Sequence, residues 1–190
     1  NDMEKIAEVN WVLEAVVERL DIKESVYKNL IPYLKNNAIL TSNTSGIPLT
    51  DLTETLPEDV KPRFMITHFF NPPRYMQLLE LVRGEKTSDD TYNTMVEFGE
   101  SVLGKGIVHA KDTPNFIGNR IGIYGMMTAL NLAAEQGFTV EEVDKLTGTI
   151  SGRPKSATFR TADVVGLDTL KNVSLTTYEK ALADEERDIF

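Results

Sequence analysis

The sequence predicts an α/β fold in which a mostly parallel sheet comes first and an all-helical region follows. Short apolar runs flank an amphipathic stretch within residues 9–42, which is the pattern of a βαβ unit. Two further apolar runs, residues 64–68 and 76–82, extend the sheet. Beyond Asp112-Thr113-Pro114 the composition shifts, and the remaining apolar residues recur at helical spacing. We therefore expect two domains, residues 1–111 and residues 112–190.

The first βαβ unit begins with residues 9–17, which are predicted to form a buried strand that Glu14 interrupts. Asp21 and Glu24 have the spacing of a capping box, so a helix is expected over residues 22–35. The second strand is predicted at residues 38–42. Parallel strands joined by a helix bring their carboxyl ends to one edge of the sheet, where open α/β folds bind ligands.

The polar turn Asn43-Thr44-Ser45-Gly46 follows the second strand at that edge. Its small side chains and its glycine suit the close approach of a cofactor. The same residue types are also the common formers of a plain turn, so both interpretations stay open from the turn alone.

The rest of the first domain adds one short helix, one longer helix and one strand. The short helix is expected near residues 49–55. A helix that begins at Thr87-Ser88-Asp89-Asp90 has acidic residues in its first turn, which suits the helix dipole. Gly104 and Gly106 are expected to end it. Residues 107–111 form a short strand, and we interpret His109 within it as structural.

The second domain is predicted to open with one long helix over residues 116–136, closed by Gly137. Its buried candidates are Ile117, Ile121, Tyr124, Leu130 and Ala134. A second capping box at Thr139 and Glu142 starts a helix to about Leu146. Further helices are expected at residues 161–166 and 168–183, and the acidic residues 184–186 are expected to be solvated.

Composition limits the classes of function. The chain has 190 residues and a formal net charge of −9, which argues against non-specific nucleic-acid binding because such binding needs a basic surface. It has no cysteine, so it has no disulfide and no thiolate metal site. No apolar run is long enough to predict a membrane span. A reducing compartment fits this composition, and we expect the protein in the cytoplasm.

His68 and Glu80 are the candidate catalytic pair. His68 ends the apolar run at residues 64–68, and Glu80 lies inside the next run, after the break at Asn71-Pro72-Pro73. If the two strands are neighbours, Glu80 can bind one ring nitrogen and leave the other free for general acid–base work. The alternative from the residues alone is a hydrogen-bonded core histidine and a solvated glutamate.

Four linked motifs resemble the L-3-hydroxyacyl-CoA dehydrogenases and cover nearly the whole chain in that family's order. They are His68-Phe69-Phe70-Asn71-Pro72 with Met76-Gln77-Leu78-Leu79-Glu80, Ser42-Asn43-Thr44-Ser45, Lys111-Asp112-Thr113-Pro114-Asn115-Phe116-Ile117-Gly118-Asn119-Arg120, and Val164-Val165-Gly166-Leu167-Asp168-Thr169. The resemblance implies a Rossmann-like NAD-binding domain, followed by the helical domain of that family. Bacterial and archaeal members, which the chain resembles most, are often fused to an enoyl-CoA hydratase.

The resemblance also implies the reaction and the residues that take part in it. An L-3-hydroxyacyl-CoA is oxidised to the 3-ketoacyl-CoA with NAD, as in fatty acid β-oxidation. His68 corresponds to the base and Glu80 to the carboxylate that fixes its tautomer. Ser45 and Asn119 correspond to residues that place the substrate oxygen and the thioester. The segment Ser156-Ala157-Thr158-Phe159-Arg160 departs from the mitochondrial-type members, which leaves the preferred acyl chain length open.

On the cofactor side, the resemblance implies Glu18 and Lys23 as a pair at the mouth of the cleft and Asn71 near the nicotinamide. No Gly-x-Gly-x-x-Gly follows a strand in this chain, although a dinucleotide site needs that turn. We therefore expect a fragment that lacks the first βαβ portion, leaves the edge of its first strand bare and, by itself, binds NAD poorly.

Two other functions remain open. A relative with the same scaffold can act on a hydroxy acid that carries no CoA. A non-catalytic scaffold fragment is the alternative from a different class, supported by the missing glycine turn. The apolar residues Tyr124, Met126, Met127 and Leu130 on the long helix suggest a homodimer face, which the resemblance also implies, while an intrachain core explains them equally well.

Overall fold

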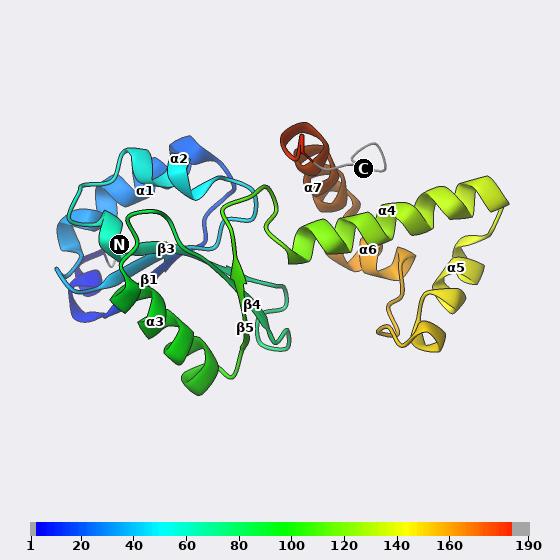
Figure 1. The fold of residues 1–190 in the computed structure, drawn as a ribbon, viewed down its shortest axis with the longest axis horizontal. Helices are drawn as coiled ribbons and strands as arrows, with labels where there is room; N and C mark the ends of the chain where they lie inside the picture. The colour runs from blue at the N-terminus through cyan, green and yellow to red at the C-terminus, as the bar shows by residue number, and fades with distance from the viewer. Residues whose placement is uncertain (1–2, 184–190) are drawn as a thin grey trace. The chain divides into compact units, whose positions relative to one another are not determined.

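The computed structural model describes residues 3–183, and the chain divides into two compact units between Phe116 and Ile117 (Figure 1). The first unit is built on a sheet, and the second consists of helices. Asp112 belongs to the first unit, where its carboxylate accepts the backbone N–H groups of Leu49 and Thr50. Each unit is described separately below.

The described residues of the first unit form a five-stranded sheet in the order β1-β2-β3-β4-β5. The strands are β1 (Trp11–Glu14), β2 (Ile39–Ser42), β3 (Phe64–Phe69), β4 (Leu78–Val82) and β5 (Gly106–Ala110). All neighbouring pairs are parallel except β3 and β4. The predicted βαβ unit and parallel sheet are confirmed. β4 runs antiparallel to β3 because the connection between them is too short for a parallel crossover.

Helices pack on both faces of this sheet, with α1 and α2 on one face and α3 on the other (Figure 1). The helical segments are η1 (Met3–Glu8), α1 (Leu20–Leu30), η2 (Ile31–Tyr33), α2 (Leu49–Glu54), η3 (Lys61–Arg63), α3 (Asp89–Glu97) and the π-helical turn η4 (Phe98–Val102). Because strand side chains alternate between faces, Leu40, Phe64 and Ile66 pack with α1 and α2. Met65 and Leu81 pack with α3.

Two boundaries at the start of the chain differ from the prediction. β1 stops at Glu14 instead of continuing to Val17, because the Glu14 carboxylate accepts the Val16 N–H at 2.7 Å and turns the chain out of the sheet. α1 begins at Leu20, so Asp21 lies inside its first turn and does not cap it. The Asp21 carboxylate binds the Arg19 guanidinium instead, and the expected capping box does not form.

The third helix of this unit begins as predicted. Ser88 caps it by accepting the Thr91 N–H. The helical backbone then continues through η4, and Gly104 ends it with a φ of +64°. Gly106 opens β5, so it belongs to the strand and not to the end of the helix. His109 is exposed on β5, and its Nδ1 lies 2.5 Å from the Tyr92 hydroxyl.

The second unit contains α4 (Gly118–Gln136), α5 (Val140–Leu146), η5 (Thr149–Ser151), α6 (Phe159–Val165) and α7 (Leu167–Lys180). Gly137 ends α4 in the left-handed conformation with a φ of +72°, and the capping box at Thr139 and Glu142 forms as predicted. α6 starts two residues before the predicted Thr161, since the Asp144 carboxylate accepts the N–H groups of Phe159 and Arg160.

The predicted buried face of α4 is wrong. Its buried residues are Ile123 and Ala133. Among the predicted residues, Ile121 is 69% exposed, Ile117, Tyr124 and Ala134 are also exposed, and Leu130 is half-buried. Apolar residues occur all around this helix, so their spacing does not single out one face. The acidic residues 184–186 lie outside the described residues. Within residues 3–183, no helix is both long enough and apolar enough to cross a membrane.

Candidate active site

The site is centred on His68 and Glu80, which face each other across the antiparallel strands β3 and β4. The distance between His68 Nδ1 and Glu80 Oε2 is 2.7 Å, and both side chains are buried. A carboxylate can only accept a hydrogen bond, so Nδ1 holds the proton. The other ring nitrogen, Nε2, is thereby left as an acceptor in the neutral ring. The sequence left open whether the two strands are neighbours; in the structure they pair, and their register places His68 opposite Glu80.

Ser45 completes a row of three side chains. Its Oγ lies 3.0 Å from His68 Nε2, and it comes from the turn after β2. With Nδ1 protonated, the Ser45 hydroxyl donates to Nε2 when the ring is neutral. The ring of Phe70 lies 4.5 Å from the His68 ring and that of Phe116 lies 5.5 Å from it, centroid to centroid. These two rings pack against the imidazole and limit its rotation.

The turn that holds Ser45 is fixed from two sides. The Asn43 side-chain oxygen accepts the Phe69 N–H of β3 at 2.9 Å. Glu18 Oε1 accepts the Thr44 hydroxyl at 2.5 Å and the backbone N–H groups of Ser45 and Gly46, both at 2.9 Å. These bonds tie the turn to β3 and to the segment after β1.

The Glu18 carboxylate is held in its charged form. Partial burial acts to raise the pKa of Glu18, but the hydrogen bonds from Thr44, Gly46 and Ser45 and the charge of Lys23 together outweigh it. The net effect lowers its pKa below the ordinary value of 4.5. Glu18 therefore stays an acceptor for the turn at neutral pH.

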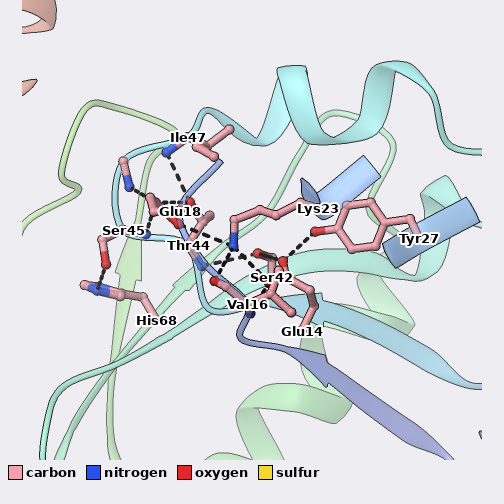
Figure 2. Close-up of polar contacts among 11 residues, drawn as sticks. Glu14, Val16, Glu18, Lys23, Tyr27, Ser42, Thr44, Ser45, Ile47 and His68 are labelled. Carbon is pink, nitrogen blue, oxygen red and sulfur yellow. Dashed lines mark hydrogen bonds and ion pairs between the residues drawn. The ribbon is translucent and has the colours of Figure 1, made fainter. Parts of the chain in front are cut away.

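Lys23 was predicted to face the cofactor at the mouth of the cleft together with Glu18. In the structure its side chain is only 1% exposed, and its ammonium lies 2.8 Å from Glu14 Oε1 and 3.3 Å from Glu18 Oε2 (Figure 2). The ammonium also donates to the Val16 carbonyl at 3.4 Å. Lys23 thus links two carboxylates beneath the surface, and a direct contact with a cofactor stays a prediction.

The two remaining predicted residues come from other segments of the chain. Asn71 is exposed directly after β3, in the loop that leads to β4. Asn119 belongs to the second unit, where it lies half-buried in the first turn of α4. Its role toward a substrate therefore stays a prediction.

The donor set at the carboxyl ends of β1, β2 and β3 fits a nicotinamide nucleotide. The Glu18 side chain is 44% exposed, so it can face a ligand while it holds the turn. A carboxylate at such an edge is the common acceptor for ribose hydroxyls. The Ser45 hydroxyl and the exposed Asn71 amide add groups that can bind a carboxamide or an alcohol oxygen.

Glu14 is the main residue of this region that the sequence did not single out. It was predicted only to interrupt a strand, but its carboxylate is buried and accepts four hydrogen bonds, from Lys23, Val16, Tyr27 and Ser42. Burial raises the pKa of the Tyr27 hydroxyl far above its ordinary value, and the charge of Glu14 adds to this effect. An acidic residue inside an apolar run was the available signal, because a buried charge needs partners.

Comparisons with known proteins identify the family of the chain. Residues 1–113 match the model of the 3-hydroxyacyl-CoA dehydrogenase NAD binding domain, and residues 116–189 match that of the C-terminal domain. A "Probable 3-hydroxyacyl-CoA dehydrogenase" of Bacillus subtilis is 48% identical over 98% of this chain and 24% of its own length. A protein of the same name from Deinococcus radiodurans is 46% identical over 92% of this chain and 50% of its own length.

A solved structure, the (S)-3-hydroxybutyryl-CoA dehydrogenase PaaH1 of Ralstonia eutropha, has a TM-score of 0.83 and 33% identity. The match covers 96% of this chain and 62% of that one. The chain thus spans about a quarter to a half of the length of the two curated relatives. It belongs to the 3-hydroxyacyl-CoA dehydrogenase family.

Proposed function

We propose that the protein is an NAD-dependent dehydrogenase that interconverts L-3-hydroxyacyl-CoA and 3-ketoacyl-CoA in fatty acid β-oxidation in the cytoplasm. The observation that carries this proposal is the hydrogen-bonded row from Glu80 through His68 to Ser45 at the carboxyl edge of the sheet. The family membership of both units supports it.

In the oxidation direction, His68 Nε2 accepts the proton of the substrate 3-hydroxyl group. Nε2 is suited to this because Glu80 keeps the proton of the neutral ring on Nδ1. The carboxylate of Glu80 then stabilises the imidazolium that forms. The Ser45 hydroxyl, 3.0 Å from Nε2, orients the substrate oxygen beside the base. Bound NAD supplies the acceptor for the hydride that leaves C3.

The reverse reaction uses the same groups. The imidazolium of His68 donates its Nε2 proton to the 3-keto oxygen as the hydride reaches C3. We assign Glu18, Lys23 and Asn71 to the cofactor side, with Lys23 acting through Glu18. Asn119 is assigned to the substrate thioester.

The acyl-CoA assignment has one alternative that a specific observation favours. A solved diketoreductase, titled as acting on dicarbonyl compounds, is 25% identical and has a TM-score of 0.78 over 99% of this chain. The same fold can therefore serve a keto substrate without CoA. A substrate comparison separates the two functions.

The experiment is NADH oxidation by the purified full-length protein with acetoacetyl-CoA or with ethyl acetoacetate, because residues 1–190 by themselves are expected to bind NAD poorly. We expect turnover with the thioester and little with the ester. A preference for the ester would favour the alternative, and no oxidation of NADH with either substrate would overturn the assignment as a dehydrogenase.

His109→Gln is a matched control for His68→Gln, because His109 is the other histidine of the chain and lies exposed on β5.

We also propose a homodimer through the helical unit. A groove of about 440 Å³ lies between α4 and α7 and is lined mainly by apolar side chains, among them Met127, Leu170 and Leu175. Exposed apolar side chains such as Leu167 and Val164 add to this surface. Sedimentation of the protein should give the mass of two chains, and a monomer at micromolar concentration would contradict the proposal.

A fused hydratase domain remains an expectation from the resemblance.

A further inference from the structure

The region below the Ser45 turn contains a buried network of charges that the proposed reaction does not use directly. Glu14 at the end of β1 is its centre (Figure 2). Its Oε1 accepts Lys23 Nζ at 2.8 Å and the Val16 N–H at 2.7 Å. Its Oε2 accepts the hydroxyls of Tyr27 at 2.8 Å and Ser42 at 2.7 Å. One carboxylate thus joins β1, α1 and β2.

The network reaches the Ser45 turn by two routes. In the first, Ser42 donates to Glu14 and accepts the Thr44 N–H at 3.2 Å, which fixes the start of the turn. In the second, the Lys23 ammonium joins Glu14 to Glu18. Glu18 in turn binds the backbone N–H groups of residues 45 and 46. Both routes therefore end on the backbone that carries the Ser45 hydroxyl.

We propose that Glu14 is a positioning residue that sets the Ser45–His68 hydrogen bond through Ser42, Lys23 and Glu18. A carboxylate is needed because all four partners of Glu14 donate, and a carboxylate has acceptor sites on both oxygens. A glutamine has a single acceptor oxygen, and its NH₂ group donates. With its oxygen toward Lys23 and Val16, its NH₂ faces the hydroxyls of Tyr27 and Ser42, which must then turn to accept instead of donate.

The charges around Lys23 also support a positioning role for Glu14. The Lys23 ammonium is shared between the carboxylates of Glu14 and Glu18 at 2.8 and 3.3 Å. Once Glu14 is neutral, Glu18 is the remaining carboxylate partner of the ammonium among the contacts described, so the pair draws together. Glu18 then moves away from the N–H groups of the turn, and the Ser45 hydroxyl moves relative to His68 Nε2. A displacement of ~1 Å at such a site costs on the order of 100-fold in rate.

The test compares Glu14→Gln with Tyr27→Phe in the purified enzyme. Tyr27→Phe removes one of the four donors but keeps the charge, so it serves as a control for lost stability. The first readout is the ¹⁵N chemical shift of His68 Nε2 without substrate, which responds to the hydrogen bond from Ser45. The chain has two histidines, so the His109→Gln variant assigns the signals.

We expect Glu14→Gln to shift the His68 Nε2 signal and to lower kcat with acetoacetyl-CoA by about 10-fold to 100-fold. Tyr27→Phe should lower the melting temperature and leave both readouts unchanged. If Glu14→Gln lowers only the melting temperature, the network is merely structural and the proposal is overturned. If Glu14→Gln does not fold, Glu18→Gln takes its place, because Glu18 is the partly exposed end of the same route. It must then shift the signal too, and an unshifted signal overturns the proposal.

The catalytic consequence rests on the proposed function, but the chemical shift does not. A shifted His68 signal together with a wild-type enzyme that does not reduce acetoacetyl-CoA supports the positioning role and refutes the proposed reaction. An unshifted signal in an enzyme that reduces acetoacetyl-CoA refutes the positioning role and supports the proposed reaction.

Discussion

Replacing Glu80 by glutamine isolates the contribution of its charge, because the two side chains have nearly the same shape. Glu80 is fully buried and its Oε2 lies 2.7 Å from His68 Nδ1. In the rotamer that points its amide oxygen at Nδ1, the introduced glutamine still accepts from Nδ1. The proton of the neutral ring therefore stays on Nδ1. The imidazolium formed during the reaction, however, loses its counter-ion.

The size of the effect follows from this bond. A hydrogen bond with a charged partner contributes about 1.5–3 kcal/mol. At about 1.4 kcal/mol for each factor of ten, kcat for Glu80→Gln should fall by about 10-fold to 150-fold.

The assay is steady-state NADH oxidation with acetoacetyl-CoA across the pH range in which the enzyme is folded. Glu97→Gln is the matched control, since Glu97 is exposed on α3. A kcat for Glu80→Gln within twofold of wild type would refute the role given to Glu80. A rise in KM with kcat unchanged would refute it as well, because it would place the effect in binding.

Three further predictions concern stability. Lys23→Met leaves the buried Glu14 carboxylate without its cation and should lower the free energy of unfolding, measured in urea, by about 3–5 kcal/mol. A decrease below ~1 kcal/mol would contradict the account of the network. Because the pKa of Glu18 is lowered in the folded state, its stabilisation is present above pH 4.5 and disappears as the pH falls through the folded pKa. The melting temperatures of wild type and Glu18→Gln should therefore differ at neutral pH and converge in acid. A difference that does not change with pH would contradict this prediction. Gly137→Ala should destabilise the fold by about 1–2 kcal/mol, since Gly137 has a φ of +72°. Gly122→Ala, with open space around the added methyl group, should stabilise it by up to ~1 kcal/mol. Equal effects of the two substitutions in thermal unfolding would contradict this prediction.

The central pair could be predicted from sequence because it depends on local features. Two apolar runs separated by Asn71-Pro72-Pro73 are close enough in the chain to pair as antiparallel strands. Their register then places His68 opposite Glu80. The helix starts at Ser88 and Thr139 were likewise visible, because an N-cap uses residues within one turn of itself.

What sequence reasoning missed depends on contacts between distant segments. Asp21 had the spacing of a capping residue, but the chain turned earlier, at Glu14, and Arg19 took the cap position. An acidic residue in an apolar run indicated that Glu14 needs partners, but its partners lie on α1 and β2, and the local pattern does not identify them. The buried face of α4 was mistaken for the same reason, because the partners that cover Ile123 and Ala133 are not implied by the spacing on α4 itself.

The most direct test of the central claim is the rate of hydride transfer in a single turnover of acetoacetyl-CoA with NADH, for His68→Gln beside His109→Gln. If His68 Nε2 is the acid and base of the reaction, the His68 variant should lose about two to four decades in this rate. The His109 variant should keep the wild-type rate. Equal rates for wild type and His68→Gln would contradict the account, because the row of Glu80, His68 and Ser45 would then have no part in the chemistry.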